Sequence, residues 1–208
     1  MHQRLVILNA RLEEFSLAVY GLAQTMFRCG IAEQEPECDG MDLALNMKFD
    51  HQCPVPIVFS TTRLMGRIKS AQTAIANMMM LCEYAESRGC VLKDSGTKLE
   101  HERALELVAV KGNRRLTLTL DLVDHEFDGE SMVTAETSTG TDVVTLFLHE
   151  KNCGIDFSDT SPATQSLYPD LPCKNGSNKV AKGQWPALFD VMVSYLLAGS
   201  KPKKRRVK

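Results

Sequence analysis

The residues best suited to acid-base chemistry lie together between positions 121 and 130. Carboxylates and one histidine occupy most of this segment: Asp121, Asp124, His125, Glu126, Asp128 and Glu130. Such a group can bind a divalent cation or transfer protons, although its spacing does not match a calcium-binding loop. Because acidic residues after a strand are more often a solvated loop, we favour that reading. An enzyme that uses this cluster is kept as an alternative.

Cysteine and histidine residues offer a second kind of chemistry. His149 and Cys153 could form a nucleophile pair if they met in the fold. A zinc site would have to combine Cys29, Cys38, His51 and Cys53, but structural zinc ligands usually come in pairs two to four residues apart. The chain has seven cysteines, an odd number without a repeating framework, which indicates free thiols in a reducing compartment.

Common catalytic motifs are missing from the chain. It contains neither of the two usual glycine-rich phosphate loops, no GxSxG nucleophile elbow and no HExxH zinc motif. We therefore expect a protein that is not an enzyme, with no catalytic residue, no metal ion and no cofactor.

A basic tail, residues 200–208, carries the clearest functional signal. It contains a proline followed by a dense run of positive charge, in the residues Lys201, Pro202, Lys203, Lys204, Arg205, Arg206 and Lys208. This segment resembles the nuclear import signal of the polyomavirus large tumour antigen type, which an import receptor reads as an extended peptide. The resemblance covers the tail alone, and it implies a nuclear location with an import receptor as partner.

The remainder of the chain is acidic. Removing the six basic residues of the tail from 24 Lys and Arg leaves 18 against 26 Asp and Glu, a formal charge of −8 for residues 1–200. Direct binding of nucleic acid by this body is disfavoured, because such domains usually present a basic face. The longest apolar run, residues 187–198, is interrupted by Asp190 and is shorter than the roughly 20 residues that span a bilayer, so we expect no membrane partner.

Two segments have the apolar spacing of long amphipathic helices. Residues 4–28 repeat large apolar side chains every three or four positions, and residues 61–88 do the same after possible N-caps at 60–62. The two helices could pair with one another. Their apolar stripes consist of Leu5, Leu8, Leu12, Phe15, Val19, Leu22 and Met26 in the first, and Leu64, Ile68, Ala71, Ile75, Met78, Cys82 and Ala85 in the second.

Elsewhere the apolar spacing changes to every second residue. Residues 104–110 and 115–123 predict one hairpin, residues 131–136 and 142–149 a second, and shorter strands are expected at 43–47, 57–59 and 154–157. Residues 158–183 read as a long surface loop, and residues 184–197 as a final helix. The order predicts an α+β fold, with long amphipathic helices packed on antiparallel hairpins in one domain over residues 1–199.

Some apolar residues exceed what one neighbouring element would cover. Met79 and Met80 lie off the main stripe of the second helix, and the last helix is apolar around most of its circumference. A helix of that kind is buried in a core or in an interface. We therefore expect association with a protein partner or a second copy, and the candidate interface residues are Met79, Met80, Leu188, Met192 and Tyr195.

Together these observations predict a nuclear binding or assembly subunit that acts through protein contacts. A clamp-like accessory protein of DNA metabolism is a further alternative, because helices and antiparallel hairpins in an acidic body with a basic patch are compatible with such a ring.

Overall fold

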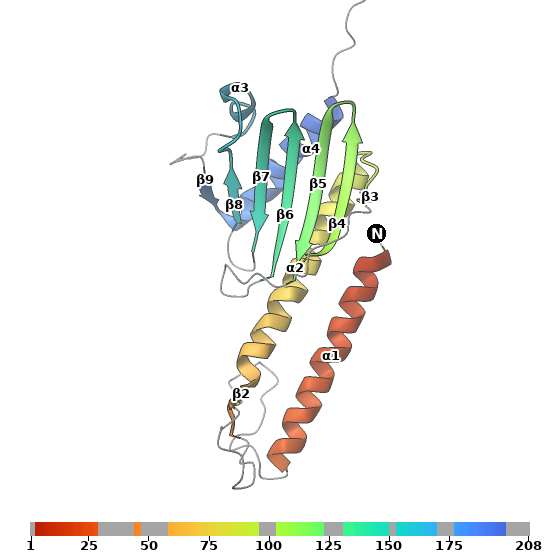
Figure 1. Cartoon of the computed structure of the whole chain (residues 1–208), viewed down its shortest axis with the longest axis vertical. Helices are drawn as coiled ribbons and strands as arrows, with labels where there is room; N and C mark the ends of the chain where they lie inside the picture. The colour runs from red at the N-terminus through yellow and green to blue at the C-terminus, as the bar shows by residue number, and fades with distance from the viewer. Residues whose placement is uncertain are drawn as a thin grey trace, which may run out of the picture.

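A computed structural model describes residues 3–28, 44–46, 58–95, 103–122, 131–149, 153–169 and 177–198. Helices and antiparallel strands occupy separate stretches of the chain, which confirms the predicted α+β class (Figure 1). In chain order the elements are α1 (Gln3–Arg28), β1 (Ala44–Asn46), β2 (Val58–Ser60), α2 (Thr61–Ser87), β3 (Lys93–Asp94), β4 (Arg103–Lys111), β5 (Arg114–Asp121), β6 (Met132–Thr139), β7 (Asp142–Leu148), β8 (Cys153–Asp156), α3 (Pro162–Gln165), β9 (Ser177–Val180), the 3-10 turn η1 (Lys182–Gln184) and α4 (Trp185–Ala198).

Within the described residues, β3 to β9 form one antiparallel sheet in which each strand pairs with its neighbour in the sequence. Both predicted hairpins are confirmed, because β4 pairs with β5 and β6 pairs with β7. Gly112 and Gly140 stand in their turns with φ of 64° and 57°. Glycine suits these positions because a side chain is strained in the left-handed region. The chain can therefore reverse within two residues at each hairpin.

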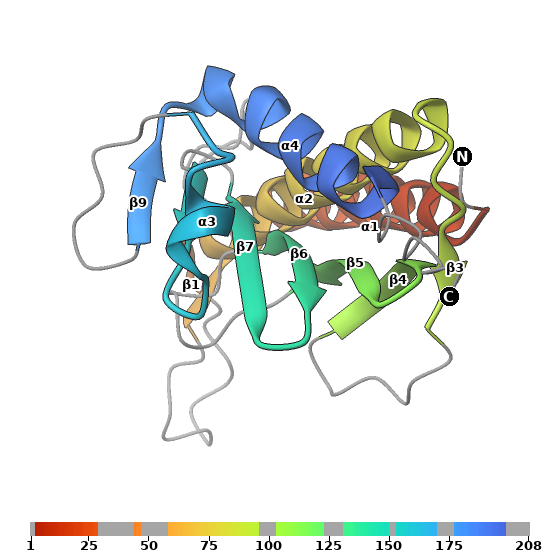
Figure 2. The ribbon, with the colours of Figure 1, turned by 90° about the horizontal axis from the view of Figure 1, so that it is seen from above.

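Helices α2 and α4 cover one face of this sheet (Figure 2). Alternation along the strands supplies the apolar side: in β5, Leu116, Leu118 and Leu120 are fully buried, whereas Thr117 between them is half-buried. On the helix side, α4 buries Leu188, Phe189, Met192, Val193 and Leu196. The sheet and α2 thus cover much of the apolar circumference of α4 within one chain.

Polar contacts join α2 to α4 at the edge of this core. The hydroxyl of Tyr84 donates a hydrogen bond of 2.5 Å to Oδ1 of Asp190, which also lies 3.1 Å from the guanidinium of Arg88. The hydrogen bond to Asp190 is the main reason why the pKa of Tyr84 is raised. These contacts link α2 to α4 directly, beside their shared packing on the sheet.

The last turn of α4 is bound by the β4–β5 turn. Lys111 Nζ donates to the carbonyl oxygen of Leu197 over 2.5 Å, and Arg114 donates to the carbonyl oxygen of Tyr195. Arg114 also stacks on the Tyr195 ring, 4.1 Å from its centroid. Cations at a helix C-terminus satisfy free carbonyl groups and oppose the negative end of the helix dipole.

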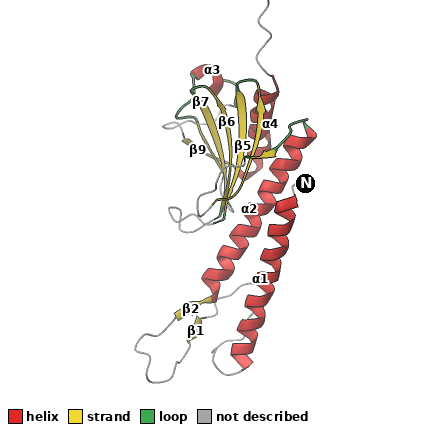
Figure 3. Ribbon diagram, turned by 45° about the vertical axis from the view of Figure 1, so that its right-hand side comes forward, coloured by secondary structure: helices red, strands yellow, loops and turns green. Residues whose placement is uncertain are grey.

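Helices α1 and α2 form an arm that extends beyond the sheet (Figures 1 and 3). They confirm the two predicted helices and pack against each other. At 26 residues, α1 is about 39 Å long. Its first turns adjoin the core through Leu5, and Arg4 forms an ion pair with Asp94 of β3. The strand pair β1–β2 is antiparallel, and Figure 3 places it near the end of the arm that is far from the sheet.

One expectation from the sequence is wrong. Residues 158–183 are not one long loop, because α3 begins at Pro162 after an N-cap at Ser161, and β9 adds a strand to the sheet beside β8. These elements are too short to show periodicity, and β9 depends on pairing with a strand that precedes it by more than twenty residues. The stripe of α1 is only partly covered by neighbouring elements, since Phe15 and Leu22 are about half exposed.

Candidate interaction surface

The acidic segment between 121 and 130 is described only at its start. Asp121 ends β5 opposite Met132 of β6, and it is half-buried. Residues 123–130 lie outside the described residues. Catalysis or cation binding by this cluster therefore stays a hypothesis.

The Cys/His alternative is disfavoured by the environment of the thiol. Cys153 opens β8 and is 2% exposed, and burial raises its pKa to about 11. A thiol with that pKa is almost entirely protonated at pH 7, whereas nucleophilic cysteines need the thiolate. His149 directly follows β7 and is half-buried. The arrangement suits a core thiol better than a nucleophile.

The residues considered for a zinc site, Cys29, Cys38, His51 and Cys53, lie outside the described ranges. The basic tail of residues 200–208, predicted to be the import signal, also lies outside them. In the part of the chain that the structure describes, no three His, Cys, Asp or Glu residues are grouped closely enough to hold a metal ion. None of the helices in these ranges combines the length and apolar character required to cross a bilayer.

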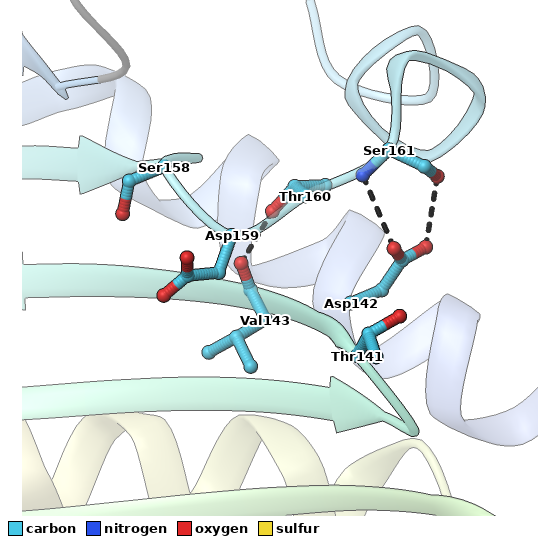
Figure 4. Close-up of a pocket in the computed structure, with 7 residues that line it drawn as sticks. All are labelled: Thr141, Asp142, Val143, Ser158, Asp159, Thr160 and Ser161. Carbon is cyan, nitrogen blue, oxygen red and sulfur yellow. Dashed lines mark hydrogen bonds between the residues drawn. The ribbon is translucent and has the colours of Figure 1, made fainter.

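A shallow pocket of about 580 Å³ lies where the β6–β7 turn meets the segment before α3 (Figure 4). Asp142 accepts hydrogen bonds from the backbone N–H and hydroxyl of Ser161, at 3.1 and 2.8 Å, and from the hydroxyl of Thr164 at 2.7 Å. These bonds hold the pKa of Asp142 below its usual value, with the Thr164 bond the largest cause. Both carboxylate oxygens are thus engaged in fixing α3 against the hairpin, which is a structural role.

A second pocket of about 350 Å³ lies on the face of the sheet opposite to α2 and α4. Its charged residues are partly paired, since Arg115 is 3.8 Å from Glu106 and donates a hydrogen bond of 3.1 Å to Thr117. Strand alternation places the hydroxyl groups there, because apolar side chains take the other face. The pocket is lined by Glu106, Arg115, Thr117, Thr119, Thr134, Glu136 and Ser138. With both signs of charge present, the pocket does not favour one class of ligand.

Exposed apolar side chains are concentrated on α1. Leu17 is 73% exposed, Leu22 55%, Ile7 52% and Phe15 49%, and Val6 is also exposed. The helix can bury little of this surface because α2 is its main neighbour along the arm. An apolar surface of this kind on one element is typical of a protein-interaction site. Ile7, Phe15 and Leu22 lie on one side of the helix, and we call these three residues the α1 surface; Val6 and Leu17 lie on the opposite side.

The five residues predicted to form an interface occupy different environments. Leu188 and Met192 lie in the core and are essentially inaccessible, so the apolar circumference of α4 is explained by packing within the chain. Met79 is half-buried against the core and Met80 is exposed. Tyr195 is half-buried beneath Arg114. The structure does not gather these five side chains on one surface, and a role for them in an interface stays a prediction.

The α1 surface was not identified from the sequence, although a signal for it was present. Val6, Ile7 and Leu17 lie off the stripe that contains Leu5, Leu8 and Leu12. An amphipathic helix with a single neighbour needs only one apolar stripe. Apolar residues on other sides of α1 therefore indicated a second contact.

No protein-family model matches the chain, and no curated protein or solved structure matches it.

Proposed function

We propose that this protein is a nuclear assembly subunit that binds protein partners through the α1 surface. The observation that carries the proposal is the exposure of Phe15 and Leu22, two large members of the heptad stripe, on an arm that extends beyond the sheet. Contact of large apolar side chains with water is unfavourable. A partner that covers them stabilises the complex by about 25 cal/mol for each Å² of apolar surface buried.

The proposed nuclear location depends on the basic tail. Lys203, Lys204, Arg205 and Arg206 provide the density of charge that an import receptor binds. The remainder of the chain contributes little attraction to polyanions, because residues 1–200 carry a formal charge of −8. Import through a receptor is therefore the role that we assign to this tail.

The binding role is tested by retention of nuclear proteins on the immobilised full-length chain. The wild type should retain a set of partners that the double variant Phe15→Glu, Leu22→Glu loses. The matched control is Leu167→Glu, because Leu167 follows α3 at the other end of the molecule and is 52% exposed. Equal retention by all three chains would contradict a role for α1 in binding.

The location is tested separately with the tail fused to a cargo too large to diffuse through nuclear pores. The cargo should accumulate in nuclei with the native tail. It should stay in the cytoplasm when Lys203, Lys204, Arg205 and Arg206 are replaced by Ala. Accumulation of the substituted cargo at the same level would remove the support for import by this segment.

A further inference from the structure

The heptad pattern of α1 leaves room for another helix beside α2. Leu5 is buried and Leu12 and Val19 are half-buried, but Phe15 and Leu22 keep about half of their surface exposed. The two exposed residues are seven positions apart and therefore lie on one side of the helix. The flanking positions on that side are all exposed, from the first turn to the last: Arg4, Ile7, Arg11, Ala18 and Thr25.

We infer that a second copy of this chain occupies this side of α1, with the two α1 helices antiparallel. The inference rests on the proposed binding role of α1 and names its partner. A two-fold axis between positions 14 and 15 would place Ile7 opposite Leu22 of the second copy, because both are equally far from the axis. The same register would bring the two Phe15 side chains together near the axis.

The distribution of charge along α1 favours the antiparallel direction. Arg4 and Arg11 both lie in the first half of the helix, on the same side as Ile7 and Leu22. In the antiparallel register these arginines face Thr25 and Ala18 of the second copy, which are uncharged. Glu14 flanks the same side at the axis and lies close to its counterpart in the second copy in either direction, so it does not distinguish the two directions. A parallel pairing would gather the four arginines of the two copies at one end, where like charges repel.

The position of the sheet is compatible with the same direction. The first turn of α1 is tied to the sheet by the ion pair between Arg4 and Asp94, whereas the last turn lies at the far end of the arm (Figure 3). An antiparallel pair of arms would therefore place the two sheets at opposite ends of the dimer, where they do not collide.

The size of the contact predicts a weak dimer. Pairing α1 over about 39 Å with a strip roughly 10 Å wide covers on the order of 400 Å² of each copy. The total of about 800 Å² is below the roughly 1,200–2,000 Å² of stable complexes. We therefore expect the dimer to dissociate in the micromolar range.

Sedimentation of the full-length chain between about 1 and 200 µM tests this inference. The wild type should shift from its monomer mass of 23.1 kDa toward twice that mass as concentration rises. Ile7→Lys and Leu22→Glu should each weaken the dimer about tenfold or more, because each places a charge opposite an apolar side chain. Leu17→Glu should not, because Leu17 lies on the opposite side of the helix and should stay exposed.

The register is tested by combining the two charged substitutions in one chain. In the antiparallel dimer, Ile7→Lys of each copy faces Leu22→Glu of the other, so the double variant should recover the affinity that the single variants lose. A double variant that dimerises no better than either single variant would overturn the antiparallel register. Circular dichroism checks that every variant keeps its helices.

The two levels of proposal fail in different ways. A wild type that stays monomeric at the highest concentration overturns self-association through α1. If nuclear proteins are then still lost from the Phe15→Glu, Leu22→Glu chain, the general binding role survives with a different partner. A monomer whose retention of nuclear proteins is also unchanged by these substitutions overturns both. A dimer that is insensitive to Ile7 and Leu22 shows contact through another surface and also contradicts the inference.

Discussion

Helices α1 and α2 have similar length and similar apolar spacing, yet their stripes are buried to different degrees. Ile68, Ile75 and Met78 of α2 are at most 4% exposed, while Phe15 and Leu22 of α1 are about half exposed. The difference lies in the neighbours: α2 packs against α1, β5 and β6, whereas α1 packs chiefly against α2. The same apolar spacing therefore contributes different amounts to the stability of the fold in the two helices, because the free energy of burial depends on the area that neighbouring elements cover.

The largest expected effect comes from placing a charge at a buried and at an exposed apolar position. Leu188→Glu, in the core beneath the sheet, should destabilise the fold by more than about 4 kcal/mol and prevent folding, because an ionised carboxylate loses its hydration there. Leu17→Glu should remain folded, because water already reaches this side chain. Far-ultraviolet circular dichroism and thermal melting distinguish the two. A folded Leu188→Glu chain would show that α4 is not a core helix.

Truncation of one stripe residue in each helix should give an intermediate effect. Ile75→Ala should lower the free energy of unfolding by about 2–5 kcal/mol, because the buried side chain leaves a cavity. Phe15→Ala should cost less than about 1.5 kcal/mol, because half of its surface is already in water.

Denaturant unfolding at submicromolar concentration measures both variants without a contribution from self-association. Equal losses for Ile75→Ala and Phe15→Ala would mean that α1 is as well covered as α2, and would remove the basis of the proposed binding surface.

The smallest expected effect concerns the attachment of α1 to the sheet. Arg4→Gln removes the ion pair with Asp94, in which both side chains are about half exposed, so the loss should be below about 1 kcal/mol and should shrink at high salt. Arg11→Gln is the matched control, because Arg11 pairs only with Glu14 of the same helix in the salt bridges that the structure describes.

Hydrogen exchange compares these two arginine variants locally. Arg4→Gln should increase exchange in the first turns of α1, whereas Arg11→Gln should leave the attachment of α1 to β3 unchanged. The same increase in both variants would show that the ion pair with Asp94 does not hold the helix in place.

Much of the fold could be predicted because it follows from local periodicity. The spacing of Leu5, Leu8 and Leu12 predicts a helix, and the alternation of Leu116, Leu118 and Leu120 predicts a strand, before any tertiary contact is known. β9 and α3 could not be predicted in this way. β9 depends on hydrogen bonds to β8, and α3 depends on the contact of Ser161 and Thr164 with Asp142, and neither leaves a periodic signal.

The sequence by itself determined the α+β class, the two long helices, the two hairpins, and the contrast between an acidic body and a basic tail. Only the tertiary structure decided which apolar residues are free to bind. Leu188 and Phe15 are both large apolar residues on helices, but Leu188 is packed against the sheet and 1% exposed, whereas Phe15 is 49% exposed. Sequence spacing fixes the side of a helix on which a residue lies, whereas burial depends on how many other elements reach that side, and that is set by contacts between residues far apart in the chain.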